Sequence, residues 1–186
     1  MKHLNTGKEQ DKLINRLERQ EKKQSIQRDR FLKYKLNEIH ASLTQELLMQ
    51  KVVESDDAGA FSELILKGLK KLLKISEFDY KFFIAPIRGL VPRPNPISLY
   101  MTQYILEDVM KDPCVVDVFG TEEDIYKTVN RVISSMNLKF ERAEEKIMQQ
   151  LSNSKSLIPG SREFDIALEE AFRKSMGDPK SGSIPQ

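Results

Sequence analysis

The sequence is poor in the residues that build metal centres, disulfides and cofactor sites. Its 186 residues include one cysteine and two histidines. One cysteine excludes an intramolecular disulfide framework and a multi-cysteine zinc site, and neither His3 nor His40 has a second histidine at metal-ligand spacing. A glycine-rich phosphate loop is also absent, since Gly89, Gly120 and Gly160 are isolated. We therefore expect no metal, no other cofactor and no enzyme activity.

Long apolar runs are lacking too. No stretch approaches the roughly 20 consecutive apolar residues of a membrane-spanning helix, and the opening MKHLNTGKEQDK lacks the apolar run of a signal peptide. Hydrophobic residues make up 39% of the chain and charged residues 31%, which is polar for a compact fold. We expect a soluble, cytoplasmic protein with part of its chain outside the core.

The charge is distributed unevenly along the chain. Residues 1–53 carry 12 lysines and arginines against 7 carboxylates, whereas residues 54–186 carry 18 against 21. The sequence thus places a basic arm on a mildly acidic body. Such an arm could bind an anionic partner or contact the acidic body. It could also simply be a helix whose charged face is solvated.

Residues 8–53 are expected to form a helix, in one or two pieces, because strong helix formers fill the first part. Apolar residues are sparse before residue 30, so burial is not expected there. Farther on, apolar residues recur at steps of three and four, which is typical of a coiled coil or of a helix in a bundle. This stripe consists of Leu32, Leu36, Ile39, Leu43 and Leu47, and it ends at Gln50.

Two hypotheses about function follow from this first part of the chain. In the first, the protein is an interaction or assembly protein whose apolar stripe docks another protein or a second copy. In the alternative, the protein is associated with nucleic acid or the ribosome, and basic residues of the same helix contact phosphates. These residues are Lys22, Lys23, Arg28, Arg30, Lys33 and Lys35. We prefer the first, because the sequence contains no base-reading motif and no aromatic stacking platform.

The middle of the chain combines aromatic residues with prolines. A helix is expected from Ser55, the capping residue, to about Lys74, followed by a short helix from Ser76 that ends at Pro86. Five of the eight prolines lie between residues 86 and 124, and none precedes residue 86. The loop over residues 86–96 carries Arg88 and Arg93, whose planar side chains suit a carboxylate or phosphate on a partner or within the fold. With the aromatic segment from residue 78, this loop is predicted to form a docking surface.

After the loop, the sequence indicates the ends of the expected helices and strand more clearly. Ser98 is expected to cap a helix from residue 99 to about 111, and residues 114–119 to form a strand in which Cys114 is a buried, inert thiol. Thr121 and Asp124 give an approximate capping box for a helix that continues to residue 151 or breaks near residue 137. Ser161 caps a last helix, and Gly177 stops it.

Four segments between residues 97 and 176 follow one another in a recognisable order. They are TQYILEDVMKDP, VVDVFGTEEDIYKTVNRVI, FERAEEKIMQQL and IPGSREFDIALEEAFRKSMG. This order resembles a bacterial family of small, uncharacterised helical proteins, a domain of unknown function, in which a segment similar to the last one opens the final helix. The resemblance implies a bacterial cytoplasmic helical domain and implies nothing catalytic.

The sequence as a whole predicts a mainly α fold. An extended, basic helical arm over residues 1–53 would join a compact helical domain over residues 55–176, and residues 177–186 would form a flexible tail. The β-branched segment around residue 116 leaves room for one short strand pair.

Overall fold

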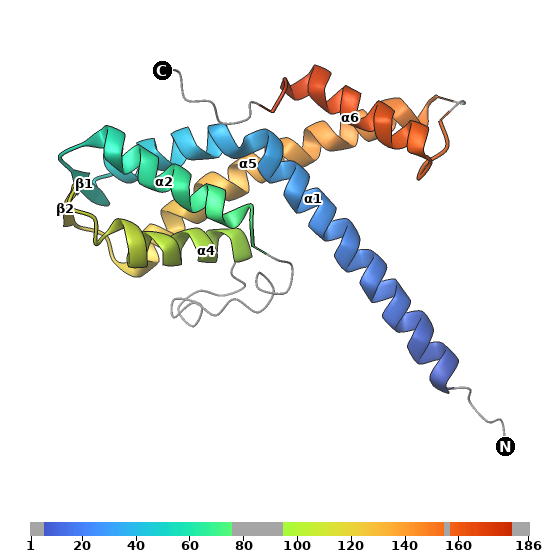
Figure 1. Ribbon diagram of the computed structural model, residues 1–186, viewed down its shortest axis with the longest axis horizontal. Helices are drawn as coiled ribbons and strands as arrows, with labels where there is room; N and C mark the ends of the chain where they lie inside the picture. Colours follow the sequence, from blue (N-terminus) through green and yellow to red (C-terminus); the bar gives the residue numbers. More distant parts are fainter. Residues whose placement is uncertain (1–5, 76–94, 155–156, 180–186) are drawn as a thin grey trace.

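The chain folds as a bundle of helices from which one helix projects (Figure 1). The structure is a computed structural model and describes residues 6–75, 95–154 and 157–179. Its elements follow in the order α1 (Thr6–Met49), β1 (Val53–Ser55), α2 (Ala58–Leu72), α4 (Pro96–Tyr104), a π-helical turn (Ile105–Val109), β2 (Val115–Val118), α5 (Glu122–Ser152) and α6 (Arg162–Met176). The predicted mainly α fold with a long N-terminal helix is confirmed. No helix in these three ranges is both long and apolar enough to cross a membrane.

α1 contains two parts with different environments. Its 44 residues form one unbroken helix, about 66 Å long at 1.5 Å per residue. Residues 7–24 are exposed on every side, and Figure 1 shows this part leaving the bundle. From Phe31 onward the helix enters the core and packs against α2 and α5. The projecting arm therefore ends inside the helix, about twenty residues before the boundary expected from the charge distribution.

The order helix–strand–helix occurs twice, once as α1–β1–α2 and once as α4–β2–α5. The two strands pair antiparallel, with Val53 opposite Val118 and Glu54 opposite Asp117, and the register shifts after Glu54. The strand at residues 115–118 and the existence of one short strand pair agree with the sequence analysis. β1 was not expected, since that analysis ended the first helix at Val53 and made Ser55 the cap of the next one. Lys51, with φ of 51°, turns the chain between α1 and β1.

Two predicted helix starts are confirmed, and two need correction. Thr121 and Asp124 form a full capping box at α5, and Ser161 caps α6. At α2 the capping side chain is Asp57, which accepts a hydrogen bond from the backbone N–H of Ala60, and not Ser55. At α4 it is Asn95, and not Ser98.

The start of α4 has a simple physical explanation. Pro96 occupies the first turn, where its missing N–H would have no helical partner in any case. The side chain of Asn95 accepts from the backbone N–H groups of Ile97 and Ser98. Ser98 is thereby left inside the helix, fully buried, and donates to the side chain of Asn130 on α5.

The remaining boundaries also bear on the sequence expectations. α5 is one helix of 31 residues, without a break near residue 137. Gly177, with φ of 80°, caps the end of α6 as expected. The expected helix between residues 76 and 86 and most of the proline-rich loop lie outside the described residues.

Candidate interaction surface

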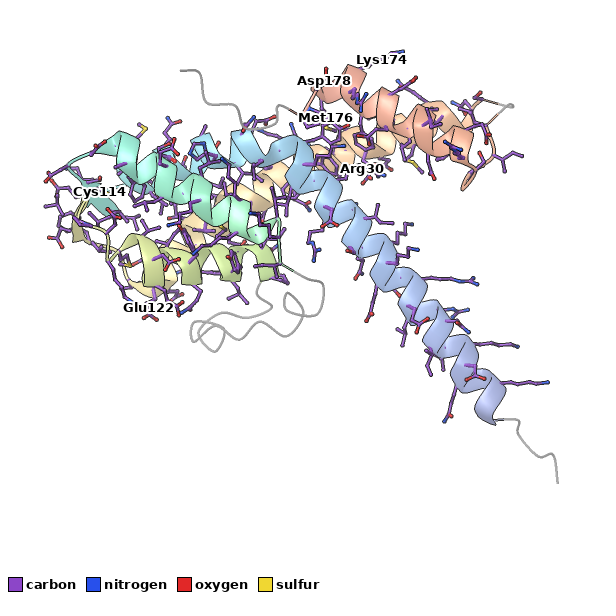
Figure 2. All side chains as sticks on the ribbon, in the orientation of Figure 1. Arg30, Cys114, Glu122, Lys174, Met176 and Asp178 are labelled. Carbon is purple, nitrogen blue, oxygen red and sulfur yellow. The ribbon has the colours of Figure 1, made fainter. Side chains whose placement is uncertain are left out.

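The projecting arm of α1 carries apolar side chains that no other part of the described structure covers. Leu13, Ile14 and Leu17 are each more than half exposed. Figure 2 shows the side chains of this arm standing clear of the bundle. Leu13 and Leu17 are one helical turn apart and share a face. We call these three residues the arm stripe.

A groove lies in the angle between the arm and α5. Its volume is about 730 Å³, and its apolar lining consists of Ile26 from α1, Met148 from α5 and Leu168 from α6. Ile26 and Met148 are exposed there, whereas Leu168 is buried. We call this feature the α1–α5 groove.

The two walls of the α1–α5 groove carry opposite charges. The wall formed by α1 presents Arg19, Lys22 and Lys23, and the wall formed by α5 presents Glu141 and Glu145. None of these five side chains forms a salt bridge within the described part of the chain. An apolar lining between charged walls matches the pattern of an amphipathic helix.

The inner end of the groove is fixed by polar contacts between α1 and α5. The side chains of Gln27 and Arg30 each donate to the carboxylate of Glu144 over 2.9 Å. The guanidinium of Arg30 also lies 4.9 Å from the ring centre of Phe172 on α6. Both charged partners are mostly buried, at 20% and 15% side-chain exposure. This cluster holds three helices together where the arm leaves the bundle.

Aromatic rings form the apolar side of the same junction. Phe31 and Phe140 meet edge to face at 5.6 Å between ring centres, and Phe140 stacks on Phe172 at 5.7 Å. Tyr34 also stacks on Phe172, at 5.5 Å between ring centres. Since Phe172 contacts both α1 and α5, it anchors α6 to the bundle.

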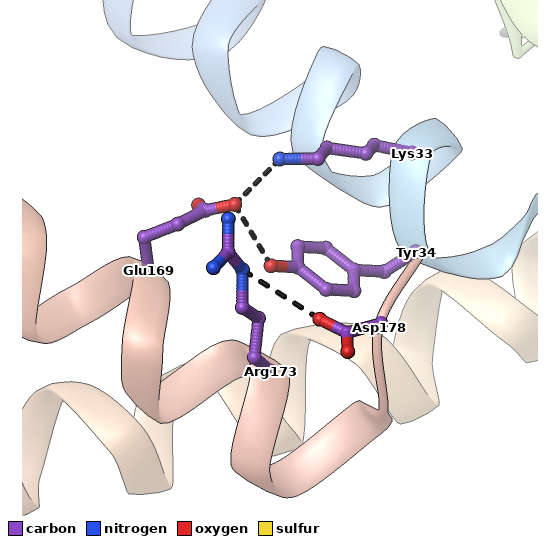
Figure 3. Close-up of polar contacts among 5 residues, drawn as sticks. All are labelled: Lys33, Tyr34, Glu169, Arg173 and Asp178. Carbon is purple, nitrogen blue, oxygen red and sulfur yellow. Dashed lines mark hydrogen bonds and ion pairs between the residues drawn. The ribbon is translucent and has the colours of Figure 1, made fainter. Parts of the chain in front are cut away.

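Polar contacts between α1 and α6 complete the junction (Figure 3). The carboxylate of Glu169 accepts from Lys33 Nζ and, over 2.9 Å, from the hydroxyl of Tyr34. The bond from Lys33 lowers the pKa of Glu169. Burial, and then the hydrogen bond to Glu169, raise the pKa of Tyr34 to about 12. Arg173 forms a longer ion pair with Asp178, at 3.8 Å.

The structure places the apolar stripe of the second half of α1 inside the bundle. Leu32, Ile39, Leu43 and Leu47 are at most 1% exposed, and Leu36 is half-buried against the same core. Their contacts are with other helices of this chain, so they have almost no surface to offer a partner. Of the two interpretations of the pattern, the structure shows a helix in an ordinary bundle. A partner would have to contact other residues of α1.

The six basic residues considered for phosphate binding are dispersed. Four of them form ion pairs within the chain: Arg28 with Asp29, Arg30 with Glu144, Lys33 with Glu169 and Lys35 with Glu38. The other two, Lys22 and Lys23, line the α1–α5 groove. Arg88 and Arg93 lie outside the described residues, and their role stays a prediction.

The residues with potential catalytic chemistry have structural partners. The ring of His40 hydrogen-bonds with the carbonyl oxygen and the hydroxyl of Ser62, at 2.8 and 2.9 Å, and so links α1 to α2. Cys114 is half-buried, and burial raises the pKa of its thiol, which disfavours the reactive thiolate. Among the described residues no group of three or more His, Cys, Asp or Glu side chains could hold a metal ion.

The α1–α5 groove was not predicted from the sequence. Its lining comes from residues more than a hundred positions apart, and only the isolated Ile26 in an otherwise polar segment hinted at it. The groove exists because α6 packs over the end of α5 while α1 leaves at an angle.

Comparison with known proteins bears on the second half of the chain. Residues 93–178 match the family model described as "Protein of unknown function (DUF507)". Searches of the curated proteins and of the solved structures found no match. The matched range covers α4, β2, α5 and α6 and confirms the resemblance that the sequence showed over residues 97–176. From residue 93 to residue 178 this chain is thus similar to a protein family of unknown function, and α1, β1 and α2 lie outside the match.

Proposed function

We propose that this protein is a non-enzymatic interaction protein that docks an amphipathic helix of another protein in the α1–α5 groove. The observation that carries the proposal is the groove itself, with its apolar lining between a basic and an acidic wall. The occupant would place apolar residues against Ile26 and Met148. Its acidic side chains would face Lys22 and Lys23, and its basic ones Glu141 and Glu145.

The geometry of α1 favours a different protein over a second copy as the occupant. Leu17 of the arm stripe and Ile26 of the groove are nine residues apart, which places them about 180° apart around the helix. In a closed twofold pair, each copy would have to use both surfaces on one side of α1. The arm stripe of one copy therefore cannot fill the groove of the other in a reciprocal way.

The alternative, nucleic-acid binding by the basic residues of α1, has less support. Carboxylates of the same chain already neutralise four of the six proposed cations. The exposed arm also carries Glu9, Asp11, Glu18 and Glu21, which offset part of its positive charge.

Site-specific photo-crosslinking in the cell of origin tests the proposal. A photoreactive residue at Met148 should give one discrete adduct with another protein. The same residue at Leu138, which is also exposed on α5 but does not line the groove, should give none. The crosslinked segment, made as a peptide, should fold as a helix and bind the purified protein. Met148→Glu should weaken that binding at least tenfold, and Leu138→Glu should leave it unchanged.

Three results would contradict the proposal. Adducts of equal yield at Met148 and Leu138 would show that proteins contact this surface nonspecifically and that the groove is not a binding site. Equal peptide affinities for the two glutamate variants would place the peptide elsewhere. An adduct between two copies of this chain would show that the groove binds a second copy and not another protein.

A further inference from the structure

A second groove lies between α5 and α6, and all of its charged lining residues are positive. Lys139, Arg142 and Lys146 come from α5 and Lys174 from α6, around a volume of about 530 Å³. Figure 2 labels Lys174 on the outer face of α6. The other lining residues are small, apolar or neutral polar, and none is a carboxylate. We call this feature the α5–α6 groove.

The four cations have no counter-ion in the described part of the chain. None of them forms an ion pair within 4.0 Å. At the spacing of one helical turn, the carboxylates on their own helices are Glu145, three residues after Arg142, and Glu170, four residues before Lys174. Neither forms a salt bridge with these cations. Basic residues near the α1–α6 junction, by contrast, are mostly neutralised.

The clustering of these cations does not help the protein to fold. Arg142 lies three residues after Lys139 and four residues before Lys146, so the three side chains share one face of α5. Like charges at these spacings destabilise a helix. An arrangement that folding disfavours, around a hollow without an acid, is typical of an anion-binding surface.

We propose that the α5–α6 groove binds the phosphate backbone of a nucleic acid. Positions 139 to 146 span about 10 Å along α5 at 1.5 Å per residue. The phosphates of one duplex strand are separated by about 3.4 Å along the helix axis, so the row of cations can follow several consecutive phosphates. Arg142 can hold one phosphate with two parallel hydrogen bonds, and the lysines supply point charges.

Binding at this groove does not discriminate between sequences. Its lining contains no aromatic side chain on which a base could stack. Contacts to phosphates alone fix the position of a duplex without reading its bases. The ligand class is therefore a nucleic-acid duplex recognised by charge and backbone.

The groove is independent of the proposed helix-docking site. Lys146 and Met148 are two residues apart and therefore lie about 160° apart around α5. Glu141 and Met148 line the α1–α5 groove, whereas Lys139 and Lys146, on the opposite side of the helix, line the α5–α6 groove. Either site could fail in an experiment without the other.

The test is a titration of a fluorescein-labelled, mixed-sequence 20-base-pair DNA duplex with the full chain, followed by fluorescence anisotropy. Four phosphate contacts predict a slope of about −3.6 for log affinity against log salt, or a loss of roughly a hundredfold between 50 and 200 mM KCl. A duplex RNA of the same length, run in parallel, shows which nucleic acid binds more tightly. Preference for either one supports the proposal.

Two triple variants with equal loss of charge locate the contact. Lys139→Gln, Arg142→Gln and Lys146→Gln together should lower the affinity at least tenfold at 50 mM KCl and reduce the slope to about −1, since each lost phosphate contact removes about one unit. Lys8→Gln, Lys12→Gln and Arg16→Gln on the projecting arm should leave affinity and slope unchanged. All six side chains are at the surface, so thermal melting should show both variants folded.

The proposal is overturned if the duplexes do not bind, or if the two variants lose affinity equally. It is also overturned if phosphatidylserine vesicles bind the groove and the duplexes do not, because the ligand would then be a membrane surface. Competition by inorganic phosphate at equal charge concentration would point to a small anion and would overturn it as well.

Discussion

At the scale of single residues, the packing of α2 against α4 depends on Gly68. A Cβ atom at this position would overlap the ring of Tyr104. That ring is held in place, because its hydroxyl donates to the carbonyl oxygen of Leu64 over 3.0 Å and Lys71 lies 5.0 Å from its centre. A buried glycine inside a helix thus marks a close approach of two elements.

Gly68→Ala should therefore destabilise the protein, although alanine is the better helix former. Overpacking of this kind lowers the free energy of unfolding by about 1–3 kcal/mol, measured by urea denaturation. Gly7→Ala is the control, because no atom lies within 4 Å of its added Cβ, and it should change stability much less. Equal stability of the two variants would mean that Tyr104 does not pack on Gly68.

The carboxylate of Glu169 should make stability depend on pH. The bond from Lys33 lowers the pKa of Glu169 in the folded state. Its contribution is therefore complete above the pKa of an unfolded glutamate, about 4.3, and is lost as the pH falls through the lower folded value. Glu169→Gln should destabilise the protein at pH 7 by at most about 1 kcal/mol, since the pair is partly exposed, and should have a smaller effect at pH 3.

Chemical denaturation at pH 7, 5 and 3 checks this expectation. Glu170→Gln, in the middle of the same helix, removes the same charge from an exposed side chain without an ion pair in the described residues. It should change stability less than Glu169→Gln at pH 7. A pH-independent difference for Glu169→Gln would show that the charge is not what stabilises the contact.

At the scale of elements, local signals predicted some boundaries and missed others. The capping box at Thr121 and the cap at Ser161 were predicted because a cap involves residues three positions apart. Asn95 was missed because the adjoining prolines favoured an extended loop, and proline fits both a loop and a first helical turn. β1 was missed because a three-residue strand depends on its partner, and that partner is Val115–Val118, sixty residues onward.

The corrected start of α4 can be tested at Asn95. Asn95→Ala removes the acceptor for two backbone N–H groups and should lower the free energy of unfolding by about 1 kcal/mol. Asn95→Asp keeps an acceptor and places a negative charge at the helix start, so it should be close to wild type. Urea denaturation compares the two. Equal destabilisation by alanine and aspartate would show that the side chain does not cap the helix.

The arm of α1 should be dispensable for folding only up to a definite residue. A chain that begins at Glu21 keeps Gln27 and Arg30, which bond to Glu144, and should melt within a few degrees of the full chain. A chain that begins at Phe31 loses both bonds and the contact of Arg30 with Phe172, and should melt lower. If both truncations melt like the full chain, the junction contributes nothing to stability. A lower melting temperature for the first would mean that the arm itself is packed.

At the scale of the whole molecule, the sequence could not decide what covers the stripe from Leu32 to Leu47. A periodic apolar face has the same spacing whether its partner is another chain or another helix of the same one. The structure covers it with α2 and α5, whose own apolar residues were also visible in the sequence. The sequence does not show which helix faces pack against one another, because this depends on contacts between residues that are distant along the chain. The two grooves were out of reach for the same reason.

The distribution of the core has a consequence for the segment that matches the known family. Buried residues of α4, the π-helical turn and α5, such as Met101, Ile105 and Val129, share one core with residues of α1 and α2. The latter include Ile39, Leu43 and Ile65. A fragment of residues 95–178 would expose its half of that core. It should therefore be unfolded or aggregated alone, although the family match lies almost entirely within it.

Co-expression with residues 6–75 should rescue this fragment. The two pieces contain all the described elements, and α1 against α5, α2 against α4 and β1 against β2 supply the interface between them. They should co-purify as a 1:1 complex with the circular dichroism spectrum of the full chain. Ile65→Asp in the first piece places a charge at a fully buried site and should abolish the complex, because an unpaired buried charge is strongly destabilising. Glu63→Asp in the same helix should not. A stable, monomeric 95–178 fragment would instead show that the family segment folds without its N-terminal half, and that α1 and α2 are an addition to a finished domain.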